Sequence, residues 1–159
     1  MPPDLRIEYG GVEQVEGALT ASTQAVGLIG AYFALLGVLL IIEGLTLRIG
    51  AACGELSRLM AEHGARCAAF VTACNPRSQA LSEEVNRERG ATLLADLVAE
   101  GLVCLAGQGR HPDGGWPPEP SLLVLGLDRV AASELGRRWD QNAVVWVGED
   151  ATPELVLLR

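Results

Sequence analysis

The chain is predicted to fold as one mixed α/β (α+β) domain with a ferredoxin-like split β-α-β core, an extra N-terminal strand and helix, and a C-terminal strand. Three observations predict this class. The chain has 159 residues, enough for one domain with a sizeable core. From residue 44 onward, short apolar runs alternate with amphipathic segments. From residue 68 onward, the order of elements is strand, helix, strand, strand, helix, strand.

Two strand–helix units open the predicted domain. Leucine and isoleucine alternate in 45–49, which predicts a strand, and an amphipathic helix follows at 53–63. The second strand, 68–74, is an apolar run that ends at Asn-Pro. The helix after it, 83–99, begins behind Ser82, whose hydroxyl is suited to cap the first turn.

Four further strands, a helix and a long loop complete the domain. They are a strand at 102–105, a glycine- and proline-rich loop at 106–120, a strand at 121–127, a helix at 129–139, and strands at 143–147 and 154–158. Right-handed crossovers then make strand 68–74 parallel to strand 102–105, with strand 121–127 antiparallel between them. By the same rule, strand 143–147 is parallel to strand 121–127.

Composition restricts the function classes. The net charge of −8 disfavours sequence-independent binding to nucleic acid, which depends on neutralising phosphates. The four cysteines form no C-x-x-C pair, so we expect buried, reduced thiols in a cytoplasmic protein. No cofactor and no protein partner is indicated by any motif.

The N-terminal segment, residues 1–43, is set apart by its apolar content. Residues 17–42 carry no charge, and the apolar density peaks in 25–42, at the lower limit of length for crossing a bilayer. One interpretation is an anchor in the inner membrane that leaves the domain at 44–159 in the cytoplasm. The other is a buried helix or a pair of core strands.

Polar residues gather at one edge of the predicted sheet. The end of strand 68–74, the start of helix 83–99 and the loop 106–120 meet there, as do the start of strand 121–127 and the residues before strand 143–147. The polar residues at these places are Asn75, Arg77, Ser78, Asn86, Arg89, Gln108, Arg110, His111, Asp113, Trp116, Glu119, Ser121, Arg137, Arg138 and Gln141. We therefore expect one polar cleft.

Asn86 is the most unusual of these residues. At 100° per residue it shares a helix face with Gly90, Leu93 and Leu97, so its amide is expected to face inward. Leaving a buried amide unpaired costs about 1–3 kcal/mol. One interpretation is that Asn86 ties down the turn at 75–78, and the other is that it shapes a ligand pocket.

Three segments carry a family resemblance. They read "FVTACNPRSQALSEEVNRERG", "GQGRHPDGGWPPEPSLLVLGLDR" and "LGRRWDQNAVVW". On these segments, residues from about 44 to 159 resemble the bacterial family described as domain of unknown function 3293. The resemblance implies no activity. It implies that the recurring polar positions of the family are Asn75, Pro76, Ser78, Asn86, Gly107, Gly109, Trp116, Glu119, Ser121 and Gln141.

Three kinds of chemistry remain open at this edge. Arginines and the start of helix 83–99 could receive the phosphate of a small phosphorylated or nucleotide-like ligand, with Trp116 stacking on a base. A hydrolase or transferase could use Glu119 as general base, with Ser78 or Ser121 as a hydroxyl participant and His111 as a proton shuttle. A protein-interaction domain, with Trp116 as a contact, is the third. A metal held by His111, Asp113 and Glu119 has no specific signature.

Of these, we favour the small-molecule or nucleotide site. Its expected ligand-binding residues are Asn75, Arg77, Ser78, Asn86, Arg89, Arg110, Trp116 and Gln141. The candidate catalytic residues are Glu119 and Ser121, and no metal ligands are assigned.

Overall fold

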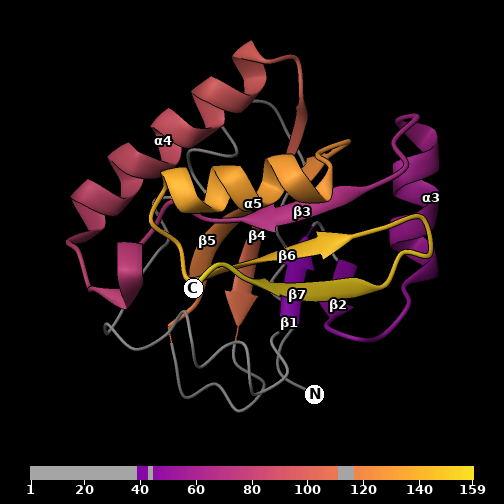
Figure 1. The fold of residues 1–159 in the computed structure, drawn as a ribbon, viewed down its shortest axis with the longest axis horizontal. Coiled ribbons are helices and arrows are strands. Elements are labelled where there is room, and N and C mark those ends of the chain that lie inside the picture. Colours follow the sequence, from indigo (N-terminus) through magenta and orange to yellow (C-terminus); the bar gives the residue numbers. More distant parts are fainter. Residues whose placement is uncertain (1–38, 43–44, 111–116) are drawn as a thin grey trace.

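The computed structural model describes residues 39–42, 45–110 and 117–159 of the chain. These residues form a single antiparallel sheet of seven strands in the order β2-β1-β4-β5-β3-β6-β7 (Figure 1). The strands are β1 (Leu39–Ile42), β2 (Leu45–Arg48), β3 (Ala68–Val71), β4 (Val103–Arg110), β5 (Glu119–Leu125), β6 (Ala143–Val147) and β7 (Pro153–Leu157). The helices are α3 (Gly54–Glu62), α4 (Glu83–Ala99) and α5 (Arg129–Arg138), with a 3-10 turn at Pro76–Ser78.

The central four strands confirm the predicted ferredoxin-like core. Their order is β4-β5-β3-β6, and β5 pairs antiparallel with both β3 and β4. β3 and β4 are therefore parallel to each other with β5 between them, as right-handed crossovers require. β6 pairs antiparallel with β3 and so runs parallel to β5. The ends of β3, the starts of β5 and β6, and the start of α4 consequently meet at one edge.

Two additions widen the sheet. β7 pairs with β6 at one side, and the antiparallel pair β1–β2 joins through β4 at the other. β1 contains the last four residues of the apolar run 25–42, so an 18-residue membrane helix over that whole run is wrong. The rest of the run, 25–38, lies outside the described residues. None of the helices that the structure describes is both long and apolar enough to cross a membrane.

Both ends of the loop predicted at 106–120 are strand. β4 extends through Arg110 and β5 begins at Glu119, so each is longer than the sequence indicates. Glycine, glutamine and proline are poor strand formers in isolation, which is why this stretch reads as a loop. Here β4 is hydrogen-bonded on both sides, to β1 and β5, and the pairing overrides the local preference.

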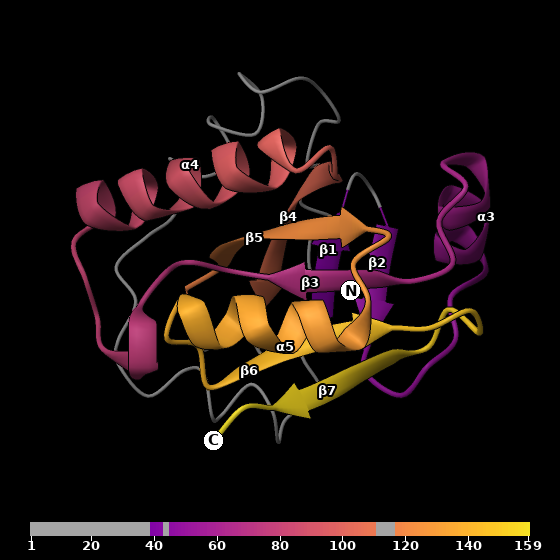
Figure 2. The ribbon, with the colours of Figure 1, turned by 45° about the horizontal axis from the view of Figure 1, so that its top comes forward.

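Alternate residues of the strands point to opposite faces of the sheet and build two cores. On one face, α4 and α5 cover a cluster that includes Leu97, Leu122, Val124 and Leu135 (Figure 2). α4 begins as predicted, because the Ser82 hydroxyl accepts a hydrogen bond from the Val85 backbone N–H. Asp128 caps α5 in the same way, through the N–H of Ala131.

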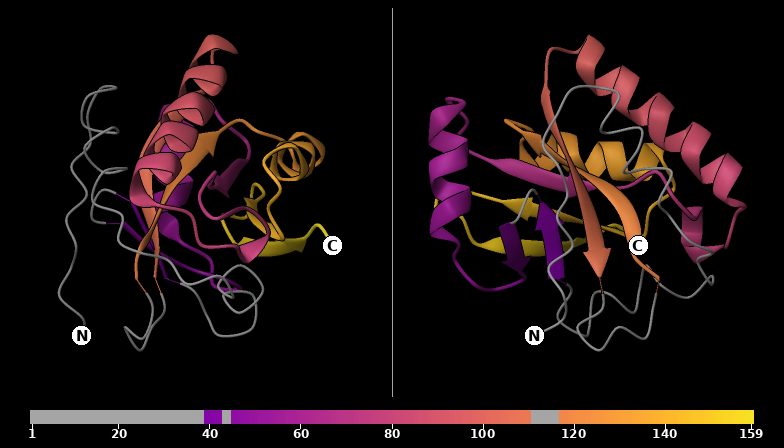
Figure 3. Two further views of the ribbon diagram at one scale, coloured as in Figure 1. Left: turned by 90° about the vertical axis from the view of Figure 1, so that its left-hand side faces the viewer. Right: turned by 180° about the vertical axis from the view of Figure 1, so that it is seen from behind.

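On the other face, the described residues supply one helix, α3, which covers one end. Leu56 and Met60 of α3 pack in a cluster with Ala68 and Leu123. Figure 3 shows α3 beside the end of the sheet at which β3 begins. Because α3 is short, with nine residues, it does not reach the opposite end of this face, where β5 begins. The polar edge of the sheet lies at that opposite end.

Leu123 tests the contribution of the α3 face to stability. Its side chain is fully buried between β3 and β4, so Leu123→Ala should lower the free energy of unfolding by about 2–5 kcal/mol. Leu157→Ala is the matched control, since Leu157 is 62% exposed and should change stability by less than about 0.5 kcal/mol. Urea denaturation measures both, and equal effects would contradict the assigned core.

Candidate functional site

The turn after β3 has an unusual backbone. Asn75, Arg77 and Ser78 all have left-handed conformations, with φ of 47°, 54° and 58°. Non-glycine residues in this region cost about 1–3 kcal/mol each and persist only where surrounding contacts hold them. Asn75 and Ser78 are also buried. The turn is therefore maintained by its neighbours, and three elements supply them.

The first neighbour is Asn86, on the first turns of α4. Asn86 is 3% exposed, which confirms that its amide faces inward. Its Oδ1 accepts a hydrogen bond from the Asn75 backbone N–H at 2.9 Å, and its Nδ2 donates to Asn75 Oδ1 at 2.9 Å. The Leu81 N–H also donates to Asn75 Oδ1, at 3.1 Å. Asn86 thus ties down the turn, as the structural interpretation of its position expects.

The second neighbour is Glu119, the first residue of β5. Asn75 Nδ2 donates to Glu119 Oε1 at 3.2 Å. Burial of the Glu119 carboxyl raises its pKa to about 7, and the hydrogen bond from Asn75 opposes this in part. No hydrogen bond to Glu119 Oε2 is formed by the described residues. A carboxyl that sits near its pKa at neutral pH is unusual outside functional sites.

The third neighbour is the segment between α5 and β6. Asp140 accepts two hydrogen bonds at Oδ1 from the Arg77 guanidinium, at 3.0 and 2.8 Å, and its carbonyl accepts the Arg77 backbone N–H at 2.7 Å. The Arg77 guanidinium, and then Arg159, hold the pKa of Asp140 below its usual value. Asn142 Nδ2 donates to Ser78 Oγ at 2.8 Å. Asp140 is itself left-handed, so two strained turns hold each other.

Arg89 and Gln141 also connect the end of β3 with the segment between α5 and β6. Arg89 Nε donates to the Ala73 carbonyl at 2.7 Å, its Nη2 donates to the Trp139 carbonyl at 3.1 Å, and its guanidinium stacks on the Trp139 ring. Gln141 Nε2 donates to the Cys74 and Trp139 carbonyls, at 3.0 and 3.3 Å. Arg89 is therefore held by structural contacts, whereas Arg87, also on α4, is exposed.

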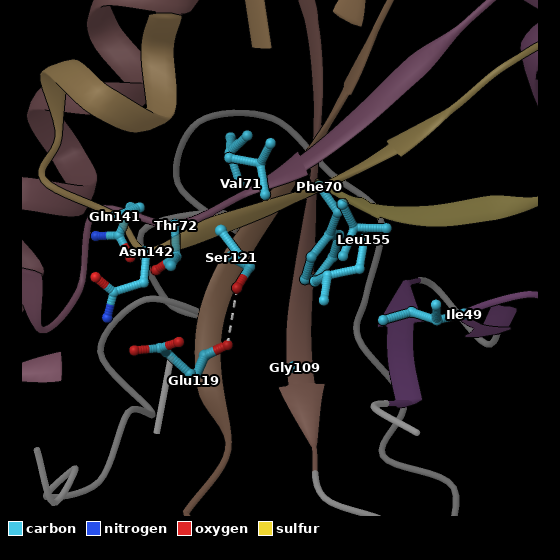
Figure 4. A pocket seen from close by; sticks show the side chains of 13 residues that line it. Ile49, Phe70, Val71, Thr72, Gly109, Glu119, Ser121, Gln141, Asn142 and Leu155 are labelled. Atoms are coloured by element: carbon cyan, nitrogen blue, oxygen red, sulfur yellow. Dashed lines mark hydrogen bonds between the residues drawn. The ribbon is translucent and has the colours of Figure 1, made fainter. Parts of the chain in front are cut away.

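These contacts frame a pocket on the uncovered end of the α3 face. The cavity has a volume of about 80 Å³. Figure 4 shows polar side chains at one end, from Glu119, Ser121, Thr72, Gln141 and Asn142, and apolar ones at the other. Its lining residues are Ile49, Phe70, Val71, Thr72, Gly109, Glu119, Ser121, Gln141, Asn142, Ala143, Val144, Val145 and Leu155. About 10–15 Å³ of such volume is enough for one water, so the cavity fits a small chemical group.

Several of the predicted site residues meet here. Glu119, Ser121 and Gln141 line the pocket, and Asn75 and Ser78 contact lining residues directly. Asn86 stands behind Asn75. The predicted cleft is therefore present as a geometric feature, with its polar end formed by the expected segments.

The predicted arginines do not line the pocket. Arg77 is bonded to Asp140 and Arg89 to backbone carbonyls. Arg110 follows the lining residue Gly109 on β4, so strand alternation directs it to the opposite face. Trp116, and the His111 and Asp113 of the metal hypothesis, lie outside the described residues. Within the described parts of the chain, no three histidine, cysteine, aspartate or glutamate side chains are grouped to hold a metal ion.

Sequence reasoning missed part of the lining. Thr72 and Asn142 belong to the polar end, and Ile49, Phe70 and Leu155 belong to the apolar end. Thr72 was detectable as the polar residue inside the apolar run "AAFVTA". The apolar residues look like ordinary core positions in the sequence, and only the short reach of α3 leaves them at a cavity.

Cys74 lies beside the site, and its thiol is not activated as a nucleophile. It is buried, and desolvation together with the Glu119 carboxyl raises the pKa of its thiol to about 12. The thiolate is the nucleophilic form of cysteine, so this residue is not a candidate nucleophile.

Comparison with known protein families agrees with the resemblance seen in the sequence. A family model described as "Protein of unknown function (DUF3293)" matches residues 71–144. The match covers 74 of the 159 residues, a little under half of the chain. The family segment runs from the last residue of β3 to the second residue of β6 and contains every polar residue of the pocket lining. No curated protein and no solved structure matches the chain.

Asn86 is expected to contribute to stability through the turn. Asn86→Ala removes the acceptor of the Asn75 backbone N–H and one of the two donors to Asn75 Oδ1, so the free energy of unfolding should fall by about 1–3 kcal/mol. Ser82→Ala, which removes only the cap of the same helix, is expected to cost about 1 kcal/mol. Urea denaturation of both variants measures the difference. A loss for Asn86→Ala below that for Ser82→Ala would contradict the role of Asn86.

Glu119 should make stability depend on pH. Its folded pKa of about 7 lies above its ordinary value of 4.5, so the folded state binds the proton more tightly than the unfolded state. Stability therefore falls as pH rises from about 4.5 to about 7. Glu119→Gln cannot ionise and should exceed the wild type by on the order of 2 kcal/mol at pH 8, with little difference at pH 4. Urea denaturation at both pH values tests this, and a difference independent of pH would contradict it.

Proposed function

We propose that this protein binds a small organic molecule in the pocket on the α3 face, with Glu119 as its main polar contact. The observation that carries the proposal is the placement of Glu119. Its carboxyl is partly buried at the polar end of the pocket, one oxygen accepts from Asn75, and the other receives no hydrogen bond from the described residues. A partly buried carboxyl oxygen that accepts no hydrogen bond from the protein is open to a donor from a ligand. A ligand would supply the missing partner.

The rigid surroundings support binding. Asn75, Asn142 and Gln141 are held by at least one hydrogen bond each to other parts of the site. A binding site needs such support, because side chains fixed in advance lose less entropy when the ligand arrives. Ile49, Phe70 and Leu155 offer apolar area at the other end of the pocket. The ligand that fits these features has one polar and one apolar end.

The phosphate-binding version of the small-molecule hypothesis loses its support. Among the described residues, the lining of the pocket contains no arginine, and its charged group is a carboxylate. A phosphate would be repelled by Glu119 and would find no cation. A cavity of about 80 Å³ is also small for a nucleotide, whose sites are usually about 300 Å³ or larger.

Catalysis by Glu119 is the second candidate function. The pKa of about 7 suits a general acid or base at neutral pH. The hydrogen bonding of Ser121 argues against its use as a hydroxyl nucleophile. Ser121 Oγ donates to the Glu119 backbone carbonyl at 3.1 Å and not to the Glu119 carboxylate. The base and the hydroxyl are therefore not paired as nucleophilic catalysis requires. Ligand binding requires no such rearrangement of the Ser121 hydroxyl, so we prefer it to catalysis.

We keep the cytoplasm of a bacterium as the proposed location. All four cysteines are free, including the three that are only partly buried. Free thiols are typical of reducing compartments. The interaction-domain hypothesis relies on Trp116, outside the described residues, so no observation on the pocket favours it.

A thermal-shift screen of the full chain against a collection of small organic fragments tests the proposed binding. Ala143 lines the pocket, so Ala143→Leu should fill part of the cavity and abolish the shift of any true pocket ligand. Ala99→Leu is the matched control, because Ala99 is exposed on α4. A ligand at about 100 times its Kd adds about 2.7 kcal/mol of stability, worth several degrees in Tm.

Two results would count against the proposal. One is a screen in which no fragment shifts Tm. The other is a set of shifts that survive in Ala143→Leu as well as in Ala99→Leu, since the fragments would then bind elsewhere.

A further inference from the structure

The polar end of the pocket has an unequal supply of hydrogen-bond donors and acceptors. In two residues, Gln141 and Ser121, all side-chain N–H or O–H donors already bond to backbone carbonyls. Gln141 Nε2 donates to the Cys74 and Trp139 carbonyls. The Ser121 hydroxyl donates to the Glu119 backbone carbonyl. Each side-chain oxygen retains lone pairs, and none of them accepts a hydrogen bond from another described residue.

Thr72 and Asn142 follow the same pattern. The Thr72 hydroxyl donates to the Pro120 carbonyl at 2.8 Å and accepts from the Cys74 N–H at 3.0 Å, so its hydrogen and its oxygen each already have a protein partner. Asn142 Nδ2 donates one hydrogen to Ser78 Oγ and retains one. Asn142 Oδ1 receives no hydrogen bond from the described residues. Together with Glu119 Oε2, the side chains thus offer four acceptors and one donor.

The charges around the pocket, like the excess of acceptors, favour a ligand that donates hydrogen bonds and carries positive charge. Glu119 is the charged residue of the lining, and the arginines nearest in sequence to the site are bonded elsewhere or lie on the other face. Buried carboxylates in proteins are normally paired with a cation. The chain as a whole carries a net charge of −8, which favours the approach of cations over anions.

From this imbalance we infer that the ligand carries a cationic nitrogen, an ammonium or a related group, attached to a short apolar tail. This inference deepens the proposed function and rests on it. One N–H group binds Glu119 Oε2, and the other two bind two of the three oxygens of Ser121, Gln141 and Asn142. The tail lies against Phe70 and Leu155, which Figure 4 shows at the apolar end of the pocket, and against Val145, which packs in the same cluster.

An ammonium suits this end of the pocket in number as well as in charge. It has three N–H donors and no acceptor, so it can bind three of the four acceptors and brings no acceptor of its own that would need a donor. A carboxylate or phosphate would face four acceptors and the Glu119 charge. An alcohol has one donor and would satisfy a single oxygen. The acceptors therefore favour the cation over isosteric neutral and anionic compounds.

Butylamine, butan-1-ol and butyrate form a matched set of probes for this inference. They share a short apolar chain and differ in the charge and donors of the head group. Binding to the full chain is followed by amide chemical shifts in 15N-labelled protein at pH 8. We expect butylamine to shift Ser121, Asn142 and Val145 and to bind at least tenfold more tightly than the other two compounds.

Two variants separate specific recognition from the general attraction of an acidic protein. Glu119→Gln should weaken butylamine binding at least tenfold while the spectrum outside the pocket is unchanged. Glu134→Gln removes the same charge from an exposed position on α5 and should leave the affinity within twofold of wild type. Equal effects of the two substitutions would overturn the inference, because attraction to the net charge would then explain binding.

The probes also distinguish failure of the ligand class from failure of the site. Should butan-1-ol or butyrate bind as tightly as butylamine, with shifts at Ser121 and Asn142, the pocket would stand and the cationic ligand would be wrong. Should none of the three compounds shift these residues at concentrations up to about 50 times a millimolar Kd, the inference would be overturned. The wider fragment screen then decides whether the proposed function falls with it.

Discussion

The buried amide pair of Asn75 and Asn86 is the interaction on which the rest of the site depends. Asn75 has a left-handed backbone that only its neighbours can maintain, and Asn86 bonds to both its backbone N–H and its side-chain oxygen. With its Oδ1 taken by Asn86 and Leu81, the Asn75 amide can present only its N–H side to Glu119. The orientation of the carboxyl at the pocket therefore follows from a contact made on α4.

The same turn joins three elements that are distant in the sequence. Arg77 and Ser78 contact the segment before β6, through Asp140 and Asn142. Left-handed residues on both sides, at 75–78 and at 140, show that each segment is bent to meet the other. Strain of this kind is common at functional sites, where geometry is kept at some cost to stability. Here the strained residues surround the polar end of the pocket.

The pocket itself results from a mismatch of lengths. The sheet is wide and its strands β4 and β5 are long, whereas α3 has nine residues and covers one end of its face. The other end keeps apolar residues beside buried polar ones, without a described helix above them. A cavity with an apolar and a polar end follows directly. The family segment at 71–144 supplies the polar end, and Ile49, Phe70 and Leu155 from outside it supply apolar area.

The sequence by itself determined the order of elements, the ferredoxin-like arrangement, the inward direction of Asn86 and the edge at which polar residues gather. These follow from local periodicity, capping residues and the handedness of crossovers, all of which are written in short stretches of chain. The lengths of β4 and β5 could not be predicted from the sequence, because glycine and proline indicate a loop unless a partner strand pairs with them. The roles of the arginines also required the tertiary structure. Arg77 binds a ligand or Asp140 depending on which group lies within about 3 Å of its guanidinium. Asp140 is 63 residues away in the sequence, so only the tertiary packing brings the two side chains together.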